Sequence, residues 1–130
     1  MNLDGISFFR LASDRLDWLG ERQRVISENI ANANTPNYRA RDVTSFDRML
    51  DGTRGAGLQV THPDHIAGSA RTDGVRVQED PDAVRSTIDG NTVALEEQTI
   101  RASETADTYR MAAELYRKGH ALLTLSVGGN

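Results

Sequence analysis

The chain is 130 residues long, carries a formal net charge of −4 and contains no cysteine. The length fits one domain, and the mildly acidic balance argues against a general binder of nucleic-acid backbones, which needs a basic surface. The absence of cysteine excludes disulfides, a thiol nucleophile and a Cys-based zinc site. Because only 38% of the residues are apolar and 5% aromatic, a monomer can bury only a modest core.

An N-terminal helix is predicted from about residue 7 to about residue 33. Ser7 is a suitable N-cap, and apolar or small residues then recur at alternating steps of three and four, the spacing of a heptad seam. The residues of this seam are Phe9, Ala12, Leu16, Leu19, Ile26, Ile30 and Ala33. We expect the seam to pack against a second helix of the same chain.

The same helix carries a second apolar stripe. Leu11, Trp18 and Val25 are spaced by seven and lie roughly 130° around the helix from the seam if each residue turns ~100°. Since one partner helix cannot cover both faces, the pattern is typical of a helix buried in a larger assembly or in a multi-helix core. The chain has too few further helices to supply such a core. We therefore predict that Leu11, Trp18 and Val25 contact other subunits.

A polar run ends this helix at residues 34–42. Three Asn within six residues favour caps and turns, and Pro36 then prevents the helix from continuing. Asn37 can adopt a left-handed conformation at modest cost, and we expect Tyr38 to anchor the chain as it leaves the helix. The run offers no nucleophile–base pair and no set of metal ligands.

The middle segment, residues 43–90, is predicted to be an irregular arm. It contains the turn dipeptides Asp51-Gly52, Asp73-Gly74 and Asp89-Gly90. Two short alternating pieces, residues 58–60 and 75–78, form a candidate hairpin. The alternative is an arm that becomes ordered only on contact with neighbours.

A C-terminal helix is predicted from about residue 93 to about residue 125. Its seam contains Leu95, Thr99, Ala102, Ala106, Tyr109, Ala113, Tyr116, His120, Leu123 and Val127. A far-side apolar set consists of Met111, Leu115, Leu122 and Leu125, and we predict contacts with other subunits there. The predicted fold class is mainly α, with the two terminal helices packed as an antiparallel coiled coil around an irregular, β-containing middle segment, all in one domain of residues 1–130.

Two motifs resemble those of a known family. The run Ala31-Asn32-Ala33-Asn34-Thr35-Pro36-Asn37-Tyr38-Arg39 is similar to the signature A-N-x-x-T-P-G-Y-R of the axial proteins of the bacterial flagellum, which include rod and hook proteins. Asn37 replaces a Gly, and Asn is a usual substitute where φ is positive. Residues 89–98, DGNTVALEEQ, resemble the family's entry into its C-terminal helix, and Thr61-His62-Pro63-Asp64-His65 is a weaker third match.

The resemblance has implications for the function. The short length points to the proximal-rod branch, where two sister proteins are candidates; the uninterrupted TPNYRARDV run and the short tail after the seam favour one of them. The resemblance implies a non-enzymatic subunit of the basal-body rod that assembles helically in the periplasm and transmits torque. The first twenty residues lack the pattern of a cleavable secretory signal, which agrees with the unfolded type III export that the resemblance implies. The implied partners are other rod proteins, further copies of the chain, the ring-to-rod adaptor FliE and the membrane-ring protein FliF. The family signature comprises Asn29, Ile30, Ala31, Asn32, Thr35, Pro36, Asn37, Tyr38 and Arg39.

Other classes of function have weaker support. His62, Asp64 and His65 are metal ligands by type, but Pro63 and the absence of another strong ligand nearby weaken a metal site, and a turn or interface contact is favoured. His120 lies on the seam, where a packing role is favoured over a catalytic one. A soluble helical adaptor or export chaperone is an alternative with one apolar groove instead of two stripes, and a small enzyme needs a convergent polar cluster that the sequence does not supply. We expect no cofactor, metal, nucleic acid or small-molecule substrate.

Overall fold

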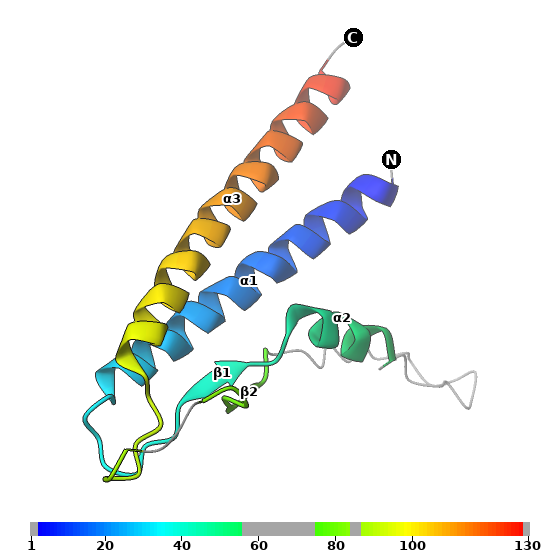
Figure 1. Ribbon diagram of the computed structural model, residues 1–130. Helices are drawn as coiled ribbons and strands as arrows, with labels where there is room; N and C mark the ends of the chain where they lie inside the picture. Colours follow the sequence, from blue (N-terminus) through cyan, green and yellow to red (C-terminus); the bar gives the residue numbers. More distant parts are fainter. Residues whose placement is uncertain (1–2, 56–74, 84–86, 129–130) are drawn as a thin grey trace, which may run out of the picture.

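The computed structural model describes residues 3–55, 75–83 and 87–128. Two long helices, α1 (Leu3–Ala31) and α3 (Leu95–Val127), pack against each other and run in opposite directions, so both termini lie at one end of the molecule (Figure 1). The shorter elements are β1 (Arg41–Val43), α2 (Phe46–Gly55) and β2 (Val77–Glu79). The strand β1 contacts α1, and β1, β2 and α2 lie on the side of α1 that faces away from α3 (Figure 1). The predicted fold class is confirmed.

The ends of the two long helices differ by a few residues from those predicted. Helix α1 begins at Leu3, so Ser7 lies inside the helix and its predicted role as N-cap is wrong. Helix α3 begins at Leu95 behind Ala94, whose side chain makes no capping hydrogen bond. Two acidic residues, Glu96 and Glu97, occupy its first turn, where negative charge complements the helix dipole.

The two strands form an antiparallel pair with Arg41 opposite Glu79 and Val43 opposite Val77. The pairing continues on both sides, because Thr44 N donates to Arg76 O at 2.9 Å and Asp80 N donates to Ala40 O at 2.9 Å. The sequence had suggested residues 58–60 as the partner of 75–78. Residues 58–60 lie outside the described residues, and the strand that the structure pairs with β2 is β1.

Helix α2 was not predicted from the sequence. Asp51-Gly52, interpreted as a turn, lies within this helix, so that interpretation is wrong. Phe46 and Met49 pack against the buried cluster formed with α1, and Met49 N donates to Ser45 O at 3.1 Å in the first turn. Tertiary packing of these two side chains offsets the low helix propensity of glycine.

The core lies where α1 meets the middle segment. Trp18, Leu19, Val25 and Val43 form the buried cluster, with Val77 packed against it. Trp18 is 6% exposed and Val25 0%, so the prediction that these two residues contact other subunits is wrong. The elements β1, β2 and α2 form a third layer over this face of α1. The sequence pattern, from which only two helices were predicted, did not indicate this layer.

Candidate functional site

The Asn-rich turn after α1 is fixed by hydrogen bonds to the segment that precedes α3. Asn37 has a φ of 61°, as its place in the signature predicted, and its N–H donates to Asp89 O at 2.9 Å. The side chain of Asn91 donates to Asn32 O at 2.9 Å and to Thr35 O at 2.8 Å. The two family motifs are therefore bonded to each other, which closes the end of the helix pair opposite the termini.

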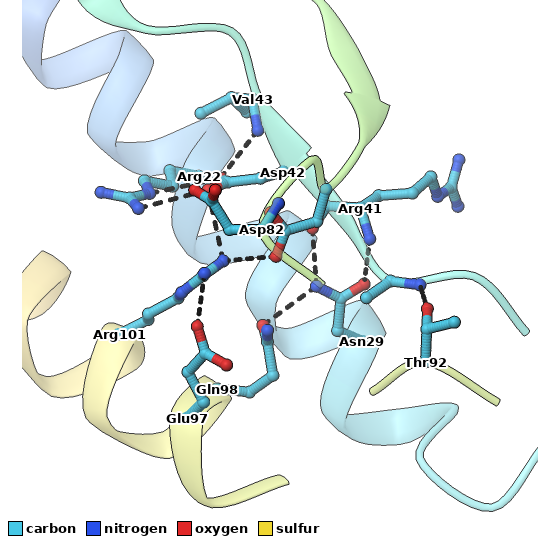
Figure 2. A network of polar contacts seen from close by, with 12 residues as sticks. Arg22, Asn29, Arg41, Asp42, Val43, Asp82, Thr92, Glu97, Gln98 and Arg101 are labelled. Carbon is cyan, nitrogen blue, oxygen red and sulfur yellow. Dashed lines mark hydrogen bonds and ion pairs between the residues drawn. The ribbon is translucent and has the colours of Figure 1, made fainter. Parts of the chain in front are cut away.

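Asn29 joins α1, β1 and α3 (Figure 2). Its side chain is fully buried and donates to Arg41 O at 2.7 Å and to Gln98 Oε1 at 3.0 Å. Its Oδ1 accepts from Arg41 N at 3.0 Å and from the Tyr38 hydroxyl at 3.3 Å. Tyr38 thus anchors the outgoing chain, as expected. An amide is the side chain that can both donate to and accept from one backbone residue in this way.

A second junction is ionic (Figure 2). Arg101 of α3 contacts Asp80 at 2.7 Å, Glu97 at 2.5 Å and Asp42 at 3.5 Å, and Arg22 of α1 contacts the same Asp42 at 3.2 Å. Burial lowers the pKa of Arg101, but the hydrogen bond to Asp80 and the charges of the three carboxylates outweigh it and raise the pKa above its ordinary value. The network holds both helices to the strand pair.

These junction residues were only partly found from the sequence. The second motif contributes Asp89, Asn91 and Gln98, but it was recognised as a resemblance and not as a hydrogen-bonding set. Glu97 lies four residues before Arg101, and this spacing was the available signal in the sequence for an ion pair. Asp80 carries no signal of its own, because its partner lies 21 residues away.

The predicted seam of α1 is placed against α3. Leu19 and Ile26 are buried, and Phe9, Leu16 and Ile30 are half-buried. The rings of Phe9 and Tyr116 meet edge to face with centroids 5.4 Å apart, a favourable aromatic arrangement. These placements agree with the predicted seam on α1.

The predicted seam of α3 is shifted by one residue along half of its positions. The buried residues of α3 are Gln98 and Thr105, and two further heptad steps place Ala112 against the core cluster and Gly119 against Phe8 and Phe9. Ala102 and Tyr116 are half-buried, whereas Leu95, Tyr109 and Leu123 are 48%, 44% and 42% exposed. Leu95 therefore lies outside the seam, and the polar Gln98 and Thr105 occupy the inward positions one residue before the predicted Thr99 and Ala106.

The remaining residues predicted to contact other subunits are uncovered. Leu11 is exposed on α1, and Met111, Leu115 and Leu122 are exposed on α3. In this chain alone, nothing that the structure describes covers them. Ala31, Pro36 and Arg39 of the signature are also exposed, whereas Ile30 and Asn32 are half-buried.

The described residues contain no group of three or more His, Asp or Glu side chains arranged to hold a metal ion. The predicted set at His62, Asp64 and His65 lies outside the described residues. His120 is exposed, with its ring centroid 6.2 Å from that of Phe9. Within the described parts of the chain, none of the helices has the length and apolar character needed to cross a bilayer.

Comparison with known proteins gives consistent matches. Residues 11–39 match the family model described as flagella basal body rod protein. The flagellar basal body rod protein FlgB of Agrobacterium fabrum is 32% identical over 129 residues, which cover 97% of this chain and 96% of the relative. FlgB of Escherichia coli is 30% identical over 115 residues, covering 79% and 80%, and FlgB of Salmonella typhimurium is 27% identical over 134 residues, covering 93% and 94%.

The helix pair, its motif-closed end and these matches define a structural protein of the bacterial flagellum. More narrowly, the chain belongs to the FlgB family of flagellar basal body rod proteins. The predicted function, a structural subunit of the rod in the flagellar basal body, is confirmed. The sister protein FlgC and the soluble adaptor or chaperone are not favoured.

Proposed function

We propose that the chain, acting as one domain, assembles helically with further copies of itself and with other rod proteins through its exposed apolar residues. The observation that carries this proposal is the exposure of Met111, Leu115 and Leu122 at 65%, 57% and 68%. At ~100° per residue these three positions fall within roughly 40° of one another on α3, so they form one stripe. Contiguous apolar surface of this kind is typical of an interface.

The α3 stripe lies to one side of the face that packs on α1. Taking ~100° per residue, it is about 100° from the inward positions Thr105 and Ala112. A neighbouring subunit can therefore reach the stripe without displacing α1. Leu11, exposed at 46%, is the corresponding apolar position on α1. Repeated contacts between unlike surfaces that do not close into a ring generate a helical assembly.

The finer parts of the proposal follow from the family. In the periplasm the assembled copies transmit torque, and the chain contacts FliE and FliF at the base of the rod. The role is structural and not enzymatic: the polar networks of Asn29 and Arg101 are occupied by hydrogen bonds and ion pairs within the chain, so they are positioned to hold elements together.

The test is Leu122→Asp, with Ser103→Asp as the matched control. Ser103 is also exposed on α3, but it lies roughly 100° from Leu122 at ~100° per residue. We expect Leu122→Asp to be produced at the normal level but to be absent from isolated basal bodies, with loss of motility, whereas Ser103→Asp is incorporated. Incorporation and full motility of Leu122→Asp would overturn the proposed face.

A further inference from the structure

A glycine in the interior of α3 lies against aromatic side chains of α1. Gly119 does not adopt a positive φ, so the backbone does not require glycine there, and apart from proline glycine is the residue least suited to a helix interior. A β-carbon built on Gly119 would lie 2.9 Å from Cε1 of Phe8 and 3.6 Å from Cε1 of Phe9. The missing side chain therefore lets the Phe8 ring approach α3 more closely than a residue with a β-carbon would allow.

The position of Gly119 places the Phe8 ring beside the α3 stripe. Gly119 follows Leu115 by four residues and precedes Leu122 by three, and residues at these spacings are neighbours on the surface of a helix. The ring that lies over Gly119 is therefore next to both leucine positions. Because both leucines are exposed, the ring extends the uncovered apolar surface of α3 toward α1.

Phe8 differs in burial from the phenylalanine that follows it. Phe9 is half-buried and meets Tyr116 across the helix pair, so it belongs to the seam. Phe8 meets the Phe9 ring edge to face with centroids 5.3 Å apart, yet it remains 45% exposed. Leu11 lies three residues further along α1 and is 46% exposed, so it adjoins Phe8 on the helix surface. The exposed apolar surface thus continues from α3 onto α1.

We infer that Gly119 is a positioning residue for assembly: it seats the Phe8 ring beside Leu115 and Leu122, so that the surface offered to a neighbouring rod subunit spans both helices. This inference rests on the proposed function, because it adds the α1 part of the same contact. Aromatic side chains supply much of the contact area at interfaces, and a side chain already held in place loses less conformational freedom on binding. The ring is held in this place because position 119 has no side chain.

Gly119→Ala tests the inference, and the same change at Gly20 is its control. The added methyl group meets the outer edge of an exposed ring, which can rotate away, so we expect the isolated chain to keep its unfolding temperature. Because the displaced ring no longer lies beside Leu115 and Leu122, we expect the amount of protein in isolated basal bodies, measured by immunoblot against total protein, to fall at least about fivefold. A β-carbon on Gly20, also within a helix, has no such contact within 4 Å, so Gly20→Ala is expected to be incorporated normally.

A second variant combines Gly119→Ala with Phe8→Leu. Leucine lacks Cε1 and Cζ, the ring carbons of Phe8 nearest to the added methyl group, but keeps an apolar side chain, so we expect most of the lost incorporation to return. Normal incorporation of Gly119→Ala, a lowered unfolding temperature of that variant, or no recovery with Phe8→Leu would each overturn the role of Gly119. If Leu122→Asp still prevents incorporation in that case, the proposed contact of the α3 stripe stands.

Discussion

Asn29 is the residue on which three elements of this protein depend. A buried amide that bonds one backbone residue twice fixes the position of the passing strand, and its contact with Gln98 extends this order to α3. Removing one partner of a buried hydrogen bond costs more than the bond itself contributes, because the other partner is left unpaired. Asn29 therefore connects helix α1 to strand β1 through hydrogen bonds, in addition to belonging to the family signature at the end of the helix.

Asn29→Ala is predicted to destabilise the protein. It leaves Arg41 N, Arg41 O and Gln98 Oε1 without their partner, and we expect a loss of about 2 to 4 kcal/mol in the free energy of unfolding, at roughly 1–3 kcal/mol for each unpaired buried group with partial relaxation. Urea unfolding followed by circular dichroism measures this loss.

The matched change is Asn34→Ala, in the turn that follows α1, where the side chain is exposed and makes no hydrogen bond to any described residue. It is expected to alter stability by less than about 0.5 kcal/mol, as is usual for surface substitutions. Asn29→Asp is a second variant: it retains an acceptor for Arg41 N but cannot donate to Arg41 O or Gln98. An equal free energy of unfolding for Asn29→Ala and Asn34→Ala would show that the hydrogen bonds of Asn29 do not stabilise the fold.

Among the secondary-structure elements, the two long helices were predicted from the sequence, but the pairing of the strands was not. Apolar periodicity and the proline-containing stop identified α1 and α3, and the positive φ of Asn37 followed from its place in the turn. Both signals are local, because they depend on residues within one or two turns of each other. The pairing of β1 with β2 joins segments more than 30 residues apart, which no local pattern reports.

Helix α2 and the inward face of α3 show why other parts of the fold were not predicted. Helix α2 has only a short apolar pattern, at Phe46, Met49 and Leu50, and its Asp-Gly pair is also a turn signal. The seam of α3 was placed one residue off at Thr99 and Ala106, where the buried residues are Gln98 and Thr105, because periodicity counts apolar and small residues. The inward face there is polar, and Gln98 is inward since its amide bonds Asn29.

The packing of Trp18 on the third layer, formed by β1, β2 and α2, gives a testable prediction. Trp18 packs edge to face on Phe46 with centroids 6.0 Å apart, and its Nε1 donates to Thr44 O at 2.7 Å. Trp18→Asp removes both contacts and buries a carboxylate, so we expect a loss of at least about 3 kcal/mol and detachment of α2. Thermal unfolding and limited proteolysis within residues 44–55 measure these effects.

Leu11→Asp is the matched control, one heptad earlier on the same stripe but exposed. It is expected to leave the unfolding temperature nearly unchanged and to impair incorporation into the rod. The two variants thus separate a fold defect from an assembly defect. Similar unfolding temperatures for Trp18→Asp and the natural chain would contradict the assigned burial.

In the whole molecule, the apolar residues of the helices fall into two groups. One group, with Leu19 and Val25, is covered by the chain itself. The other, with Met111, Leu115 and Leu122, is left open on α3, although the chain has a modest apolar content. We propose that neighbouring rod subunits cover the second group, since each copy in a helical assembly is surrounded by others.

Whether neighbouring subunits cover the α3 stripe is measured by cysteine labelling of Leu115→Cys. A maleimide is applied to the isolated chain and to intact basal bodies, with Ser103→Cys as the reference position. We expect rapid labelling of both thiols in the isolated chain and, in basal bodies, at least tenfold slower labelling at position 115 than at position 103. Equal labelling of the two positions in basal bodies would contradict this expectation.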